Sequence, residues 1–338
     1  MLDGPDRGFA PLLATFRGVD LETVHRGLVV IADAAGRLVW AAGDPRQTVL
    51  LRSAAKPFQA AAVVTGGAAD AYALTQEELA VMASSHAGEE RHVWLVAGLL
   101  GRLGLGPEAL ACGVHAPFNV TVAAGLVAAG RQPGPLQNNC SGKHAGMLAL
   151  ALAQGLDPAD YTAADHPVQR FVTQVVADLA GLDPEGILDG TDGCGVPVFR
   201  MTALQAATLY ARLAEGTHPT LARVRDAMLA YPELVGGEGR LDTRAMRAAR
   251  GALVCKGGAG GVQGLGLVPD AGHPRGLGCF VKVGDGSSSP LPFLLAGFLN
   301  ANGLSSASEE VVGPGGHAVH DLHGRVVGRV DVLVDFAG

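Results

Sequence analysis

A serine and a lysine stand three residues apart in the segment Arg52-Ser53-Ala54-Ala55-Lys56. Residues with this spacing share one face of a helix, so the two side chains are expected to meet one turn apart. A serine hydroxyl is a poor nucleophile until a base takes its proton, and a desolvated neutral lysine can be that base. The pair predicts nucleophilic catalysis, and the alternative of a helix cap beside a solvated lysine stays open.

Lysine is scarce in this chain. Of its 25 basic residues only four are lysine, namely Lys56, Lys143, Lys256 and Lys282. Arginine supplies surface charge equally well but cannot lose its proton in a protein, whereas a buried lysine can. Each lysine is therefore a candidate for a role that needs a neutral amine, unless codon bias alone left these four.

Lys256 follows an apolar run, residues 252–255, and precedes two glycines. A lysine at the end of a strand and before glycines presents its amine to a cleft, although a surface lysine beside a turn is the alternative. With Ser53 and Lys56, and with Ser84-Ser85 between, the order of motifs is similar to that of serine β-lactamases and penicillin-binding proteins.

Two cysteines lie in separate polar, glycine-rich segments, Cys140 in residues 138–146 and Cys194 in residues 190–195. They could converge on a soft divalent metal such as zinc, with Lys143 one helical turn from Cys140. Two buried cysteines acting as small apolar residues are the alternative. Asp192 could orient a ligand or be an ordinary turn residue.

The pattern along the chain is strand-like at both ends and helical between them. Strands are expected at residues 11–17, 24–31, 38–42, 252–255, 262–268, 276–283 and 326–336, and helices at 76–83, 90–103, 141–153, 167–180, 202–214, 219–231 and 290–300. Thr75 and Glu78 form a capping-box pattern for the first of these helices. We predict an α/β fold with a sheet from about residues 10–45 and 252–336 and a largely helical insertion at about 53–231.

Composition excludes several classes of protein. A formal net charge of −7 without any basic run argues against a nucleic-acid partner. Residues 1–7 lack the positive region of a signal peptide, and the longest uncharged helical stretches are too short to span a bilayer. Without an export signal, the five cysteines are expected to be reduced thiols. The expectation is a cytoplasmic protein without a membrane partner.

Five motifs together resemble one family, the thermolabile, rhizobial-type (class 3) L-asparaginases. They occur in the family's order, and the similarity extends from about residue 10 to 336. The motifs are residues 52–59 (Arg-Ser-Ala-Ala-Lys-Pro-Phe-Gln), 83–89 (Ala-Ser-Ser-His-Ala-Gly-Glu), 139–146 (Asn-Cys-Ser-Gly-Lys-His-Ala-Gly), 192–197 (Asp-Gly-Cys-Gly-Val-Pro) and 256–259 (Lys-Gly-Gly-Ala).

The resemblance implies a single catalytic domain over residues 10–336 with a β-lactamase-like fold, a homodimer, and hydrolysis of L-asparagine to L-aspartate and ammonia. It implies two catalytic pairs, Ser53 with Lys56 and Ser85 with Lys256. It also implies a zinc site made by Cys140, Lys143 and Cys194, with Asp192 beside it to orient the substrate. The zinc would not be needed for the chemical step.

Two departures from the family's pattern concern loops. The turn after Lys256 lacks an acidic residue near Gly260, and the three serines after Gly286 stand where a basic residue is expected. The alternatives are a glutaminase, a penicillin-recognising hydrolase with the same Ser-x-x-Lys motif, and a non-catalytic sensor of a small molecule or zinc. Which serine forms the ester, and what Lys282 does, stay open.

Overall fold

The structure is a computed structural model that describes residues 8–270 and 275–336, so residues 1–7, to which the signal-peptide argument applies, lie outside it. The chain divides into two compact units. Unit 1 comprises Met1–Val49, Met201–Glu215 and Arg244–Gly338, and unit 2 comprises Leu50–Arg200 and Gly216–Thr243. Within the described ranges, no helix has the length and hydrophobicity needed to cross a membrane.

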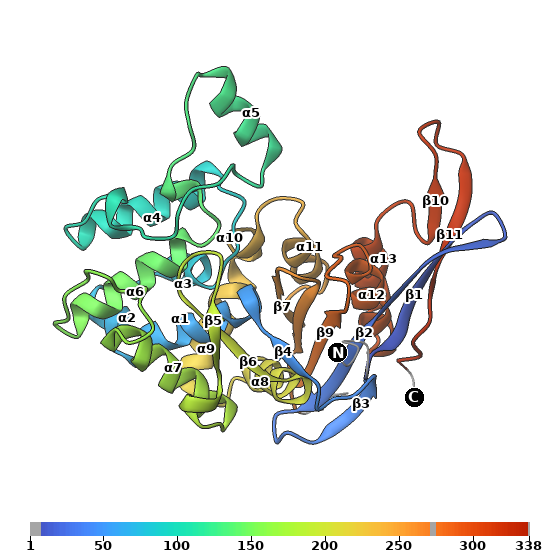
Figure 1. Ribbon diagram of the computed structural model, residues 1–338, viewed down its shortest axis with the longest axis horizontal. Coiled ribbons are helices and arrows are strands. Elements are labelled where there is room, and N and C mark those ends of the chain that lie inside the picture. Colours follow the sequence, from blue (N-terminus) through green and yellow to red (C-terminus); the bar gives the residue numbers. More distant parts are fainter. Residues whose placement is uncertain (1–7, 271–274, 337–338) are drawn as a thin grey trace, which may run out of the picture. The chain divides into compact units, whose positions relative to one another are not determined.

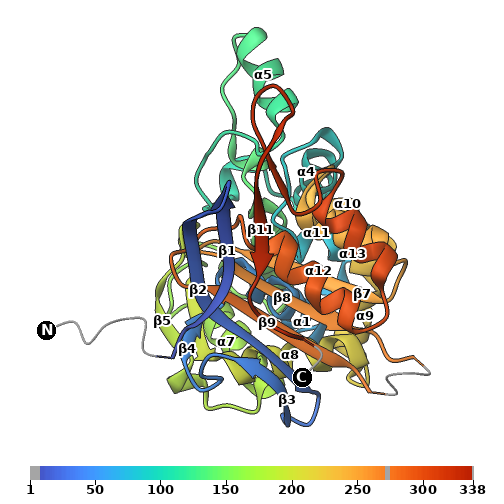
Figure 2. The same ribbon diagram turned by 90° about the vertical axis from the view of Figure 1, so that its right-hand side faces the viewer.

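An antiparallel sheet built from both ends of the sequence forms the centre of unit 1 (Figure 2). Its strand order is β10-β11-β1-β2-β9-β8-β7, and β3 also pairs with β2. The pair β2–β9 joins segments far apart in sequence, with Val30 opposite Phe280. The strands are β1 (Ala10–Arg17), β2 (Asp20–Asp33), β3 (Leu38–Ala42), β7 (Leu253–Gly258), β8 (Val262–Leu267), β9 (Leu277–Val283), β10 (Ala318–His320) and β11 (Val326–Val332).

Helix α8 (Ala203–Glu215) packs directly on the backbone of β8 and β9. A Cβ atom at Gly278 would lie 1.8 Å from the Ala207 carbonyl oxygen, and one at Gly264 would lie 2.0 Å from the Tyr210 ring. Glycine at these strand positions is therefore what lets the helix approach so closely. Helices α12 (Leu291–Ala301) and α13 (Ser305–Val312) pack on each other, and α12 also contacts β9 and β11.

Unit 2 is mostly helical, and its core lies between α1, α3, α6, α7 and α9. Helix α6 is almost wholly buried, and a Cβ at Gly142 would lie 2.2 Å from the Val81 carbonyl oxygen of α3. The helices are α1 (Lys56–Thr65), α2 (Ala68–Ala71), α3 (Gln76–Met82), α4 (Glu90–Arg102), α5 (Val120–Ala128), α6 (Ser141–Ala153), α7 (Pro167–Ala180), α9 (Pro219–Ala230) and α10 (Pro232–Gly236). Short 3-10 turns include η1 (Arg52–Ala55).

Helix α5 projects from the rest of unit 2, and none of its nine residues is buried (Figure 1). Asn119 caps it by accepting hydrogen bonds from the N–H groups of Thr121 and Val122. A smaller sheet has the order β4-β6-β5, from Thr48–Leu50, Pro197–Thr202 and Leu188–Thr191. Helix α11 (Leu241–Ala248), like β4 and β6, runs across the division between the units.

The predicted α/β class is confirmed, with a sheet from both ends of the chain and helices between. The predicted bounds of α6 and α7 agree with the structure, and Thr75 and Glu78 make the expected capping box. The sequence did not predict α5, α13, or the strands β5 and β6 within the helical region. A single catalytic domain over residues 10–336 stays a prediction.

Candidate active site

Lys56 is buried in unit 2 with its amine surrounded by oxygen atoms. It begins α1 directly after the turn η1, and only 1% of the residue is exposed. Its Nζ donates to the Ser84 carbonyl at 2.5 Å and the Asn139 carbonyl at 3.1 Å, and lies 3.0 Å from Ser85 Oγ. Loops far apart in sequence therefore converge on this amine.

The three oxygens around Lys56 suit both protonation states of its amine. An ammonium has three N–H donors, enough for the two carbonyls and Ser85 Oγ. A neutral amine keeps two N–H donors for the carbonyls, and its lone pair can accept the hydroxyl proton of Ser85. A proton can therefore pass between Ser85 and Lys56 without any change in the positions of the heavy atoms.

Ser85 lies in the loop after α3, and its backbone N–H donates to the Val235 carbonyl at 3.0 Å. Ser53 lies on η1 and is partly exposed. Within residues 8–270 and 275–336, no hydrogen bond joins the Ser53 hydroxyl to Lys56, whose serine partner is Ser85. The expected pairing of Ser53 with Lys56 stays a prediction, because a side chain at the protein surface can still turn.

Lys256 lies in unit 1, on β7, and is fully buried. Its Nζ donates to the Gly257 carbonyl at 2.6 Å. The expected pairing of Lys256 with Ser85 of unit 2 stays a prediction that rests on the order of the motifs.

Cys140, Lys143 and Cys194 come together in unit 2. Cys140 precedes α6, and its backbone N–H donates to Asn138 Oδ1. Cys194 lies in the turn between β5 and β6, and its Sγ is 2.8 Å from Lys143 Nζ. A hydrogen bond from Cys194 lowers the pKa of the Cys140 thiol well below its usual value, while the same bond and burial raise that of Cys194. Both sulfurs therefore lie close to the Lys143 amine.

Asp192 is held by Arg52, the residue before Ser53. Arg52 Nη2 lies 2.7 Å from Asp192 Oδ1, which also accepts the Gly193 N–H. Burial opposes ionisation of Asp192, but the Gly193 hydrogen bond and the Arg52 charge outweigh it and lower the pKa of the carboxyl. Arg52 has a left-handed φ of 49°, a strained conformation that is common at functional sites. Sequence reasoning missed its role, although it stands inside the first motif.

The residues present fit a zinc ion in one specific way. Within the described ranges, no three side chains of His, Cys, Asp or Glu are grouped to hold a metal ion. Zinc would therefore need Lys143 as a neutral third ligand beside the two cysteine sulfurs. Burial disfavours the charged form of Lys143, but electrostatic attraction to the two cysteine sulfurs outweighs it and raises the pKa of the amine, so zinc would have to displace a proton.

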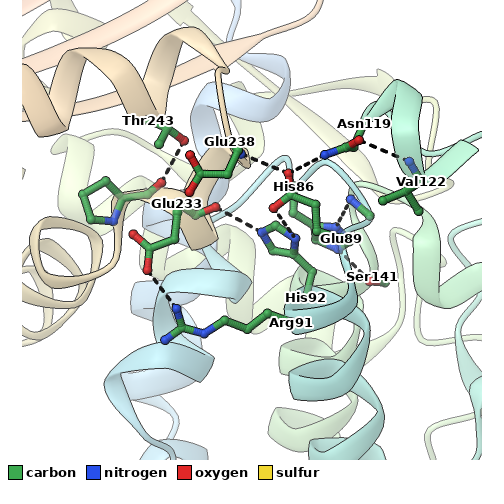
Figure 3. A network of polar contacts seen from close by, with 12 residues as sticks. His86, Glu89, Arg91, His92, Asn119, Val122, Ser141, Glu233, Glu238 and Thr243 are labelled. Atoms are coloured by element: carbon green, nitrogen blue, oxygen red, sulfur yellow. Dashed lines mark hydrogen bonds and ion pairs between the residues drawn. The ribbon is translucent and has the colours of Figure 1, made fainter.

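Two of the histidines near the motifs have supporting contacts. His86 Nδ1 accepts the Gly88 N–H at 3.1 Å, so its Nε2–H donates to Ser141 Oγ at 2.9 Å (Figure 3). Burial lowers the pKa of His86 well below its usual value and keeps the ring neutral. His115 Nε2 accepts the backbone N–H of Asn139 at 3.0 Å, and so supports the segment whose carbonyl binds Lys56.

The comparisons with known proteins identify the class. The family model for L-asparaginase II matches residues 13–332, so the chain belongs to the L-asparaginase II family and is an amidohydrolase. No curated protein matches the sequence.

Among solved structures, a probable glutaminase from Bacillus subtilis in complex with 6-diazo-5-oxo-L-norleucine is 14% identical, with a TM-score of 0.38, over 82% of this chain and 85% of that chain. A Bacillus glutaminase in 4.3 M NaCl is also 14% identical, with a TM-score of 0.37, over 82% of this chain and 91% of that chain. Likenesses this distant do not carry an argument about activity.

Proposed function

We propose that this protein hydrolyses L-asparagine to L-aspartate and ammonia, through a serine whose proton is taken by lysine. The observation that carries the mechanism is the 3.0 Å contact between Lys56 Nζ and Ser85 Oγ inside a buried ring of carbonyl acceptors. Membership of the L-asparaginase II family supports the reaction class. The choice of asparagine over glutamine rests on the resemblance of the five motifs to class 3 asparaginases.

In the proposed reaction, Lys56 takes the hydroxyl proton and the serine oxygen forms a bond to the side-chain amide carbon of the substrate. The C–N bond then breaks, and ammonia leaves with a proton returned by the Lys56 ammonium. Water then attacks the ester carbon while Lys56 accepts one of its protons. The bond between this carbon and the serine oxygen breaks, and the Lys56 ammonium returns the proton to the serine oxygen as aspartate leaves. The contact with Lys56 favours Ser85 as the nucleophile, and Ser53 and Lys256 would assist as the second serine and the second amine.

We assign substrate orientation to a second polar cluster, made of Arg52, Asp192, Cys140, Lys143 and Cys194. Asp192, fixed by Arg52, would attract the substrate's ammonium group. Cys140, Cys194 and Lys143 would hold a zinc ion, which supplies positive charge toward the polar backbone end of the substrate when it is bound. We further propose a homodimer, which the mass of the protein in solution tests.

An ammonia-release assay with L-asparagine and L-glutamine as separate substrates tests the function. Release from asparagine at a kcat/KM well above that for glutamine supports the proposal, and the reverse order assigns a glutaminase. Covalent labelling by a β-lactam would indicate a penicillin-recognising enzyme. Binding of either amino acid without any turnover would leave a non-catalytic sensor and refute hydrolysis.

A further inference from the structure

The carboxylate of Glu89 binds the loop that carries Ser85 to two neighbouring segments. Its Oε1 accepts two hydrogen bonds, from Asn119 Nδ2 at 2.9 Å and from the backbone N–H of Glu238 at 3.0 Å (Figure 3). Its Oε2 lies 3.7 Å from Nδ1 of His92. One carboxylate thus joins the start of α5, the segment after α10, and α4.

The position of Glu89 in the sequence would suit a different use of its side chain. It is the N-cap residue of α4, where a side-chain oxygen commonly accepts an N–H from the first helical turn. Glu89 makes no such cap hydrogen bond. Its carboxylate instead binds groups that are distant in sequence, so a role in the local helix does not account for it.

The loop is attached to the α10 segment at two points. The Ser85 N–H donates to the carbonyl of Val235 in α10, and Glu238, three residues later, donates to Glu89. These two hydrogen bonds join the segment 85–89 to the segment 235–238 at both ends. The two segments thus form a closed ring that contains the candidate nucleophile, Ser85. The loop is also attached to the base of α5, because the Asn119 N–H donates to the Ala87 carbonyl at 3.0 Å.

Glycine at position 237 shows how closely these segments approach. A Cβ there would lie 2.4 Å from Ala87 Cβ and 3.2 Å from Glu89 Oε1, and Gly237 has a φ of +104°. There is no room for a side chain between the two segments. The ring therefore leaves the loop little freedom while Glu89 holds it closed.

We propose that Glu89 is a positioning residue that keeps Ser85 Oγ within hydrogen-bond reach of Lys56. The inference rests on the proposed function, in which that contact passes the proton. A displacement of about 1 Å at a reacting group can cost on the order of 100-fold in rate. Among the described residues, the Glu89 carboxylate contacts Asn119, Glu238 and His92 and not Asp192, Cys140 or Cys194, so its loss is expected to lower kcat and leave KM nearly unchanged.

Two variants of Glu89 test this. Glu89→Ala removes both acceptor contacts, and kcat for ammonia release is expected to fall about 10- to 100-fold with KM within about twofold of wild type. Glu89→Gln keeps Oε1 for both donors and is expected to recover kcat to within about threefold. The glutamine N–H can also donate to His92 Nδ1, which is buried without a hydrogen-bond partner among the described residues. This nitrogen is an acceptor, because the hydrogen of the ring is on Nε2 and donates to the Glu233 carbonyl.

The matched control is Glu90→Ala, which removes the neighbouring, exposed carboxylate and is expected to keep the kcat of wild type. If Glu89→Ala does not fold, the variant Asn119→Ser tests the same contact. A serine at position 119 can still cap α5 but is too short to donate to Glu89, so this variant is expected to lower kcat about threefold to tenfold.

A folded Glu89→Ala with the kcat of Glu90→Ala would overturn the inference, as would equal losses in Glu89→Ala and Glu89→Gln. The wild-type protein separates the two proposals. If it releases no ammonia, the proposed function fails; if it is active and Glu89→Ala matches it, only the role of Glu89 fails.

Discussion

Replacing Lys56 by arginine tests the centre of the mechanism, because arginine keeps the positive charge but cannot give up its proton. Removing a general base typically costs about 10²- to 10⁴-fold in rate, equivalent to about 3–5 kcal/mol of transition-state stabilisation. Lys56 is 1% exposed and its amine lies among the oxygens of Ser84, Ser85 and Asn139, so burial disfavours bulk solvent as a substitute base. We therefore expect Lys56→Arg to lower kcat at least 100-fold.

Arginine is a better choice than methionine at this position. Methionine would leave the carbonyls of Ser84 and Asn139 without a donor, at a cost of about 1–3 kcal/mol each. Arginine can still donate to both, and its extra bulk costs about 1–3 kcal/mol through overpacking. A loss of activity in a folded Lys56→Arg protein would therefore be due to the loss of proton transfer by residue 56.

The assay is steady-state ammonia release, with thermal unfolding to show that the variant is folded. Lys282→Arg is the control, since Lys282 is only partly buried, lies on β9 of unit 1 and has no assigned role. It is expected to keep the kcat of wild type. A Lys56→Arg protein within tenfold of the wild-type kcat would refute lysine as the base.

Three further predictions concern single side chains. Ser85→Ala should lower kcat more than Ser53→Ala does, because Ser85 is the serine in contact with Lys56; the opposite order in the ammonia assay would reassign the nucleophile. Cys194→Ser should reduce the zinc bound per chain, measured by elemental analysis after equilibration with zinc, and an unchanged zinc content would remove Cys194 from the metal site. Gly142→Ala should lower stability by about 1–3 kcal/mol, since its Cβ would lie 2.2 Å from the Val81 carbonyl. Gly98→Ala, in open space on α4, should be neutral or stabilising in the same thermal unfolding experiment.

The sequence predicted those parts of the fold that periodicity and helix-start signals determine. Pro167 and the apolar spacing after it defined α7, and the run of apolar residues after Ser141 defined α6. Helix α5 was missed because its Val, Ala and Gly residues cover no core, so they follow no amphipathic pattern. The strand glycines at 264 and 278 were also uninformative in advance, since only the packing of α8 explains them.

The candidate site was predictable in its residue types but not in its contacts. The spacing of Ser53 and Lys56 suggested a local pair, whereas the Lys56 amine contacts Ser85, 29 residues away. Such a contact depends on how the α3 loop folds back, which spacing does not encode. The Glu89 ring was likewise hidden, because its partner at Glu238 is a backbone N–H, a group that every residue except proline has.

The strand order of unit 1 has a consequence for synthesis of the chain. The hairpin β1–β2 is synthesised before its neighbour β9, which follows roughly 240 residues later, a delay of roughly 10–50 s at usual rates of translation. Strands β1, β2 and β3 can pair as soon as they are made, but the edge of β2 that pairs with β9 has no partner until then. The amino-terminal strands of each new chain must therefore wait with unpaired edges while unit 2 is made, which exposes nascent chains to aggregation and makes them candidates for chaperone protection.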